Sequence, residues 1–274
     1  MTHIHPTAIV DTAASIGEGV SIGPFTIIEA GAVIGDRTKI LSSAFVAGCC
    51  EIGPDCEIHT GALVGGPPQM LGMKGAGGRV RVGAGTIVRE HVTIHRATDD
   101  AAATTVGEGC FLLANSHIAH DCRVGNEVVL ANGALLAGHV SVGDRAFVSG
   151  NAVVHQFARI GRLAMIGGGS RVAKDVVPFT MVVNDSEVYG LNTVGLRRAG
   201  FNAAERQELK RIFRTLYRSS LNLSQALDVL RGGEPSSVLT EILTFIEGSK
   251  RGLCAGGPRG RRMKSAARDT DDDR

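Results

Sequence analysis

Four histidines between residues 117 and 155 are the side chains best suited to acid–base chemistry in this chain of 274 residues: His117, His120, His139 and His155. His120 is followed directly by Asp121. A neutral imidazole can take a proton from a hydroxyl, and an adjacent carboxylate can fix its tautomer and stabilise the imidazolium that forms. Gly138 has no Cβ, so its backbone N–H can come close to a developing oxyanion. A base beside an oxyanion donor predicts acyl transfer.

A six-residue period determines where these residues lie. Ile or Val recurs every six residues from Ile4 to Val64, and an aliphatic residue continues the same phase over residues 82–94 and from Val106 to Val172, at all 26 positions. Neither a helix nor a simple strand alternation has this period. Three hexapeptides, about 18 residues, make one turn of a triangular β-solenoid, in which each unit is buried by stacking on its neighbours.

Residues 18 positions apart stack above one another in such a solenoid. His120, Gly138 and Gln156 therefore form one column at an edge of the prism, and His139 and His155 lie one position to either side of it. At a strand spacing of ~4.8 Å these groups converge within about 10 Å. One outward histidine would be ordinary at a surface, but four at one edge predict a site. Cys122 falls on the inward phase, so direct attack by an acceptor hydroxyl is more economical than an acyl-enzyme.

Two segments, residues 65–81 and 97–105, interrupt the period without shifting its phase, so we expect both to loop out of the prism. The first is too rich in Gly and Pro to continue a ladder of strands. Loops that stand on a rigid scaffold are where binding groups collect.

The period ends after Asp175, and helical patterns follow. Asn202 and Glu205 form a capping box for a helix that ends near Tyr217, and two more helices are expected over 223–231 and from Pro235 to Glu247. We therefore expect an all-β solenoid over residues 1–190 and a small α-helical region over 191–250. The last segment, 251–274, has no apolar period and carries blocks of like charge, which predicts a disordered tail.

The composition agrees with a thin core of small aliphatics, because 43% of the residues are hydrophobic and none is Trp. The formal charge of +2 indicates no nucleic-acid partner. No leader pattern and no apolar run of about 20 residues is present, which predicts a cytoplasmic protein without stable membrane insertion. Four cysteines share the inward phase and are expected to be small buried hydrophobes: Cys50, Cys56, Cys110 and Cys122.

Three segments closely resemble the UDP-N-acetylglucosamine O-acyltransferases: NSHIAHDCRVGN (115–126), LLAGHVSVGD (135–144) and AVVHQFARIG (152–161). The resemblance covers roughly residues 2–253 and includes VTIHR (92–96), GLRRAGF (195–201) and SKRGL (249–253). It implies left-handed coiling, against the usual right-handed preference, and a homotrimer with sites between subunits. It also implies transfer of a 3-hydroxyacyl chain from the phosphopantetheine of acyl carrier protein to the 3-hydroxyl of UDP-N-acetylglucosamine, the first step of lipid A biosynthesis, with no further cofactor.

The resemblance also assigns roles to residues. It implies that His120 is the catalytic base, Asp121 its carboxylate partner and Gly138 the oxyanion donor. The remaining matches are substrate-binding residues: Gln69 and Lys74 in the first loop, His117, His139, His155 and Gln156 along the acceptor and pantetheine groove, Gly168 at the position that sets acyl-chain length, and Asn192 and Arg198 in the connector. Glycine at 168 is similar to members that take longer chains.

Three positions depart from the family pattern. Met70 and Gly72 stand where the family's first loop has an acid and a lysine, and Ala199 stands where it has a second arginine. Each change removes a group near the sugar nucleotide, although Lys74 could replace the lysine. A 3-amino UDP-sugar therefore stays open as the acceptor.

Two functions of other classes also remain as alternatives. The histidines could hold zinc, as in hexapeptide hydratases of the carbonic anhydrase type, but His117 and His120 are only three residues apart where those enzymes use a wider pair. We therefore expect no metal, which metal analysis can test. The other alternative is a trimeric scaffold without catalysis, and the intact His120, Asp121 and Gly138 argue against it.

Overall fold

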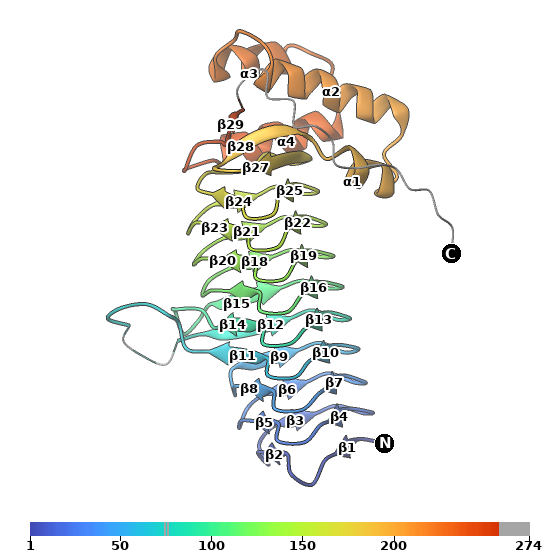
Figure 1. Ribbon diagram of the computed structural model, residues 1–274, viewed down its shortest axis with the longest axis vertical. Coiled ribbons are helices and arrows are strands. Elements are labelled where there is room, and N and C mark those ends of the chain that lie inside the picture. Colours follow the sequence, from blue (N-terminus) through green and yellow to red (C-terminus); the bar gives the residue numbers. More distant parts are fainter. Residues whose placement is uncertain (74, 76, 258–274) are drawn as a thin grey trace.

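The computed structural model describes residues 1–73, 75 and 77–257. Over this range the predicted solenoid is present: short parallel strands form three sheets, the walls of a triangular prism, and a helical region covers one end of it (Figure 1). Sheets A, B and C hold 12, 9 and 8 strands.

Sheet A consists of β1 (His3–Ile4), β4 (Ser21–Ile22), β7 (Lys39–Ile40), β10 (Glu57–Ile58), β13 (Ile87–Val88), β16 (Phe111–Leu112), β19 (Val129–Leu130), β22 (Phe147–Val148), β25 (Met165–Ile166), β27 (Thr180–Val183), β28 (Glu187–Leu191) and β29 (Ala255–Gly256). Sheet B consists of β2 (Ile9–Val10), β5 (Ile27–Ile28), β8 (Phe45–Val46), β11 (Leu63–Gly66), β14 (Thr93–His95), β17 (His117–Ile118), β20 (Leu135–Leu136), β23 (Val153–Val154) and β26 (Arg171–Val172). Sheet C consists of β3 (Ser15–Ile16), β6 (Val33–Ile34), β9 (Cys50–Ile52), β12 (Arg79–Val82), β15 (Ala103–Val106), β18 (Arg123–Val124), β21 (Ser141–Val142) and β24 (Arg159–Ile160).

The aliphatic ladder fills the prism as the period predicts. Its members from Ile22 to Val172 are buried, whereas Ile4, Val10 and Ile16 are not fully covered. These three belong to the first coil, which has no coil beneath it. All six cysteines are free, and the four on the inward phase are buried, as expected.

Both interruptions leave the prism at the corner that joins sheet B to sheet C. The first runs from β11 to β12 and stands off the prism (Figure 1), and the second runs from β14 to β15. Each is shorter than the sequence predicts, because its last residues return to sheet C. There β12 pairs with β15 over four residues, from Arg79 opposite Ala103 to Val82 opposite Val106.

In the part of the chain that the structure describes, four helices follow the solenoid: α1 (Thr193–Arg198), α2 (Ala203–Tyr217), α3 (Leu223–Arg231) and α4 (Ser237–Glu247). The last three confirm the predicted helices, and the capping box of Asn202 and Glu205 is present. The sequence did not predict α1, whose six residues are too few for a helical period. None of the four helices in the described ranges has the length and apolar character needed to cross a membrane.

The helices pack on the end of the prism around Phe179, which is fully buried among Leu163, Leu209 and Ile242. The prediction that the tail begins at residue 251 is wrong in its first part. Residues 255–256 form β29, which pairs with β28, and Cys254 is buried with its N–H bonded to the carbonyl of Asp175. This pairing joins segments far apart in sequence, so no local pattern signals it. The rest of the predicted tail, 258–274, lies outside the described residues.

Candidate active site

The corner between sheets B and C, here called the BC corner, holds the residues that the coil arithmetic brought together. His120 and Asp121 lie in the turn after β17, Gly138 and His139 in the turn after β20, and Gln156 in the turn after β23. Each coil stacks on the next in parallel register, with His117 opposite Leu135. The column predicted from the spacing of 18 residues is therefore present.

His120 and Asp121 form a hydrogen-bonded pair. Nδ1 of His120 lies 2.8 Å from Oδ2 of Asp121, and each side chain is only 12% exposed. An ionised carboxylate only accepts hydrogen bonds, so Nδ1 carries the proton and Nε2 keeps its lone pair in the neutral ring. The pair therefore presents Nε2 as a base.

The electrostatics of Asp121 favour its ionised form. Burial raises the pKa of its carboxyl, but hydrogen bonds from His120 and from Thr98 lower it more, so the net pKa is below its usual value. Nε2 of His139 lies 3.6 Å from Oδ2 of the same carboxylate. Asp121 is thus a fixed negative charge that can stabilise an imidazolium on His120.

Gly138 lies directly against the imidazole of His120. A Cβ built on Gly138 would be 2.5 Å from Cε1 and 2.7 Å from Nε2 of that ring, so only glycine leaves room for it. The N–H of Gly138 donates no hydrogen bond within the described ranges. A free donor beside the basic nitrogen is the arrangement that an oxyanion requires.

His139, His155 and Gln156 continue the same corner. The ring of His139 stacks on Phe157 with a centroid distance of 4.5 Å and lies edge-on to His120 at 5.2 Å. His155 and Gln156 are exposed, and Nδ1 of His155 lies 3.1 Å from the backbone oxygen of Gln156. These groups form an open, polar continuation of the site along the prism.

His117 lies on β17, beside the corner. Its Nδ1 is 2.7 Å from the hydroxyl of Thr93, and its ring contacts that of His95 at 5.2 Å. Burial, together with the neighbouring His95 and His120, lowers the pKa of His117 to about 4. It is therefore neutral at physiological pH and can act as a hydrogen-bonding group without adding charge.

Cys122 is excluded as a nucleophile in the way the repeat predicts. Its side chain is fully buried, its thiol donates to the backbone oxygen of Ala137, and burial raises its pKa to about 12. A thiol of this kind stays protonated at neutral pH and is unreactive.

The first loop also starts at the BC corner, and Gln69 is the one of its two predicted binding residues that the structure describes. Gln69, Met70 and Leu71 are exposed, and Leu71 is completely so. Lys74 lies outside the described residues.

Asn192 and Arg198 lie elsewhere in the chain. They line a groove of about 660 Å³ on sheet A, together with Phe147, Met165 and Met181. Asn192 is buried and caps α1: its side-chain oxygen accepts from the N–H of Gly195, and its amide donates to the backbone oxygen of Leu163. Arg198 is exposed.

Gly168 lies at a third position, the corner that joins sheet A to sheet B. A Cβ there would meet only the carbonyl oxygen of Gly150, at 3.6 Å, so a side chain fits without displacing the backbone. The predicted substrate groups of the chain are thus divided among two corners of the prism and a groove on sheet A.

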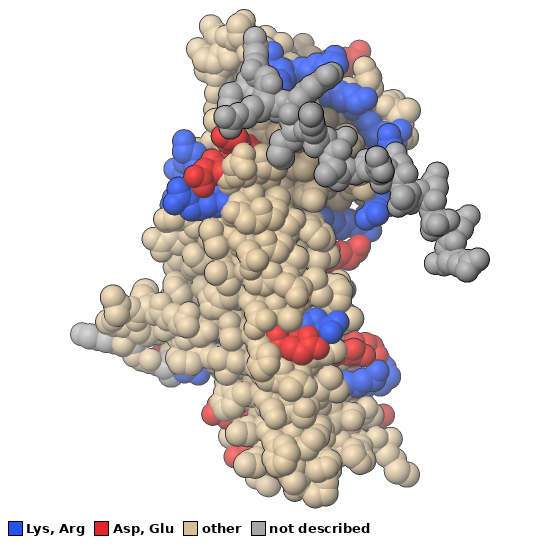
Figure 2. All heavy atoms as spheres, viewed as in Figure 1, with Lys and Arg blue, Asp and Glu red and all other residues tan. Residues whose placement is uncertain are grey.

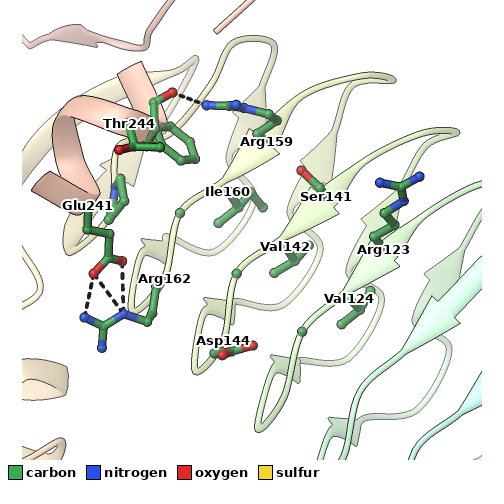
Figure 3. A pocket seen from close by; sticks show the side chains of 15 residues that line it. Arg123, Val124, Ser141, Val142, Asp144, Arg159, Ile160, Arg162, Glu241 and Thr244 are labelled. Atoms are coloured by element: carbon green, nitrogen blue, oxygen red, sulfur yellow. Dashed lines mark hydrogen bonds and ion pairs between the residues drawn. The ribbon is translucent and has the colours of Figure 1, made fainter. Parts of the chain in front are cut away.

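A further groove lies between the outer face of sheet C and α4 (Figure 3). Arg162 bonds to Glu241 at 2.7 Å there, and Arg159 bonds to the buried carboxylate of Asp175 at 3.1 Å and to the backbone oxygen of Phe245. None of the predicted site residues lines it. These contacts join the helical region to the prism.

His120, Asp121 and His139 also form a set whose ligand atoms lie within 4.8 Å of one another, close enough to hold a metal ion. Oδ2 of Asp121 already accepts hydrogen bonds from His120 and from Thr98. The geometry therefore suits a hydrogen-bonded dyad, and metal analysis distinguishes the two arrangements.

Sequence reasoning missed three contributors to this corner: Thr98, Thr104 and His95. The two threonines lie in or just after the second interruption, where the 18-residue spacing does not predict which residues stack on one another. His95 stands in the VTIHR segment, but the family resemblance assigns it no role. Its ring bonds to the backbone oxygen of Pro67 and so connects β14 to the first loop.

Comparison with known proteins gives the same family from sequence and from structure. The family model described as "Udp N-acetylglucosamine O-acyltransferase; Domain 2" matches residues 175–254, and that of the bacterial transferase hexapeptide (six repeats) matches residues 31–66 and 103–138. The chain is 43% identical to the acyl-[acyl-carrier-protein]–UDP-N-acetylglucosamine O-acyltransferase of Thermodesulfovibrio yellowstonii over 93% of this chain and 100% of the relative. The corresponding protein of Halorhodospira halophila is also 43% identical, over 92% of this chain and 99% of its own length.

Solved structures agree. The UDP-N-acetylglucosamine acyltransferase of Francisella novicida superposes with a TM-score of 0.89 at 34% identity and covers 94% of this chain and 95% of its own. That of Bacteroides fragilis gives a TM-score of 0.88 at 36% identity, over 91% of this chain and 99% of its own. The predicted left-handed hexapeptide β-helix is thereby confirmed.

Proposed function

Because the chain belongs to the acyl-[acyl-carrier-protein]–UDP-N-acetylglucosamine O-acyltransferase family, we propose that it transfers a 3-hydroxyacyl chain from acyl carrier protein to the 3-hydroxyl of UDP-N-acetylglucosamine, in the cytoplasm and as the first step of lipid A biosynthesis. The observation that carries the proposal is the His120–Asp121 pair, whose free Nε2 lies against Gly138. The proposal needs no cofactor other than the phosphopantetheine that carries the donor.

The reaction proceeds without an acyl-enzyme. Nε2 of His120 takes the proton of the acceptor hydroxyl as its oxygen attacks the thioester carbonyl carbon. The Gly138 N–H donates to the oxyanion, and Asp121 stabilises the imidazolium. Collapse of the intermediate breaks the carbon–sulfur bond, and His120 returns its proton to the departing thiolate. The products are the ester and the free pantetheine thiol.

The active form is a homotrimer in this proposal, because one protomer does not assemble the site. His120 lies at the BC corner, whereas Asn192 and Arg198 line a groove on sheet A. A neighbour whose sheet A faced sheet B of the first protomer would bring the two sets together. Outward apolar residues lie at matching heights on the two sheets: Leu135 and Val153 on sheet B, and Val129 and Phe147 on sheet A.

The charge distribution supports an acidic donor protein. Lys and Arg side chains gather over the helical region, whereas much of the prism face in the same view carries few charges (Figure 2). Exposed cations of α1 and α2 include Arg197, Arg198, Lys210 and Arg214. Such a surface raises the rate at which an acidic carrier protein arrives.

The test is His120→Ala in a reconstituted reaction. The protein is incubated with a panel of acyl carrier protein thioesters and UDP-N-acetylglucosamine, and products are identified by mass spectrometry. We expect kcat to fall by ~10² to 10⁴, the usual contribution of a general base, with sedimentation and melting temperature unchanged. A variant that keeps most of its kcat at saturating substrate would exclude this mechanism.

Two parallel measurements separate the alternatives. A 3-amino analogue of the acceptor, which would give an amide, tests whether the changes at Met70, Gly72 and Ala199 have altered acceptor choice. Metal analysis of active protein tests for a metal at His120, Asp121 and His139. A stable, active monomer in sedimentation would contradict the trimer.

A further inference from the structure

The second loop contacts the carboxylate of the dyad directly. The backbone N–H of Thr98 donates to Oδ1 of Asp121 at 3.1 Å, and the Thr98 hydroxyl donates to Oδ2 at 2.8 Å. Thr98 therefore binds both oxygens of the carboxylate whose Oδ2 also accepts from His120. No other residue in the described ranges makes two hydrogen bonds to the Asp121 side chain.

A second threonine, Thr104, also holds Asp121 in place. In the coils above, the residue at this turn position donates its N–H to a backbone oxygen of the coil below: His139 to His120, and Phe157 to Gly138, each at 3.0 Å. Asp121 lies above the interrupted coil and has no such oxygen, so its N–H donates to the hydroxyl of Thr104 at 2.8 Å. Thr104 is fully buried, so this hydroxyl has one fixed position.

We propose that Thr98 is a positioning residue for the proposed acyl transfer, and that the loop between β14 and β15 exists to hold Asp121 where it orients His120. This inference rests on the proposed function. Two hydrogen bonds from one residue fix the plane of the carboxylate as well as its distance. A carboxylate held in this plane keeps Nδ1 of His120 as the donor and Nε2 as the base, which is how an outer residue affects catalysis without touching substrate.

The test compares variants that differ by one hydroxyl. Thr98→Val removes the hydroxyl and keeps the shape, and Thr98→Ala and Thr98→Ser differ from each other only in that group. We expect kcat to fall about tenfold in the Val and Ala variants, which corresponds to ~1.4 kcal/mol and to one hydrogen bond. KM for both substrates should be nearly unchanged, and Ser should restore kcat. Thr105→Val is the matched control, because Thr105 points outward on β15 and its hydroxyl makes no side-chain hydrogen bond in the described ranges.

A double-mutant cycle excludes a general effect on folding. In the Asp121→Ala background, Thr98→Val should cause no further loss, because the bond it removes is already absent. The proposal would be overturned if Thr98→Val lowered kcat equally in the parent and in the Asp121→Ala background. It would also be overturned if Thr98→Ser lost as much kcat as Thr98→Ala and the losses paralleled a fall in melting temperature. Full activity of Thr98→Val would likewise overturn the role of Thr98, and an inactive His120→Ala measured beside it would leave the proposed reaction intact. An active His120→Ala would instead refute the reaction itself.

Discussion

Gly138→Ala tests the geometry of the site with one added methyl group. The new Cβ would lie 2.5 Å from Cε1 and 2.7 Å from Nε2 of His120, whereas carbon atoms pack at about 3.5–4.0 Å. The imidazole must therefore move by about 1 Å, because the backbone of the turn is held by its neighbours. Such a shift lengthens the 2.8 Å bond between Nδ1 and Asp121 and displaces the base.

A displacement of 1 Å at a reacting group costs roughly 10² in rate. We therefore expect kcat to fall about 100-fold, with the melting temperature within a few degrees of the parent. The fold should tolerate alanine, because the same turn position holds His120 in the coil below and Gln156 in the coil above. The N–H of residue 138 is retained, so the loss reports on His120 and not on the oxyanion donor.

The assay is the initial rate of ester formation at saturating carrier thioester and UDP-N-acetylglucosamine. Gly190→Ala is the control, because a Cβ there meets nothing within 4 Å. The double variant His120→Ala/Gly138→Ala should be no slower than His120→Ala alone, since the methyl then has no ring to displace. A Gly138→Ala enzyme within threefold of the parent would refute the placement of His120 against Gly138.

Three further predictions concern other parts of the chain. The Gly168→Met variant should fold, because a Cβ there meets only one carbonyl oxygen, at 3.6 Å. In competition assays it should prefer donors with shorter acyl chains. An unchanged preference would show that residue 168 does not line the acyl-chain site. Truncation after Gly257 should leave activity and melting temperature nearly unchanged. Truncation after Leu253 removes the buried Cys254 and β29, so it should lower the melting temperature. If the two truncated proteins melted at the same temperature, β29 would contribute no stability. Cys49 should be the first of the six cysteines to react with iodoacetamide at pH 7, because hydrogen bonding with Cys50 and the nearby Arg96 lower its pKa to about 6. Mass spectrometry of tryptic peptides measures the order of labelling, and earlier labelling of another cysteine would contradict the prediction.

The regular part of the site could be predicted because the solenoid converts sequence spacing into position. Residues 18 apart stack at a fixed separation, so His120 and Gly138 had to meet once the period was recognised. The same arithmetic explains why Cys122 is buried and Asp121 is not. What the arithmetic did not give was the degree of enclosure: His120 points outward from the prism, yet its side chain is only 12% exposed.

The remainder could not be predicted because it depends on contacts without a period. Thr98 reaches Asp121 from a loop whose path no spacing rule determines. The helix α1 is too short for a hydrophobic period, although Asn192 as its N-cap and two arginines in its last turn were local signals for it. The strand β29 depends on pairing with β28, about seventy residues away, and two residues of Ala and Gly carry no strand preference.

The position of the dyad in the solenoid accounts for both its rigidity and its chemistry. His120 and Asp121 belong to the first uninterrupted coil above the two insertions, so different structures hold them from the two sides. Above, the regular coil of Gly138 and His139 is fixed by the ladder and offers a free N–H. Below, the strands still pair, but the loop between β14 and β15 interrupts the corner, and there the hydroxyls of Thr98 and Thr104 bond to Asp121. The insertion beneath the dyad adds Thr98 to Thr104, and together the two residues hold both the side chain and the backbone N–H of Asp121.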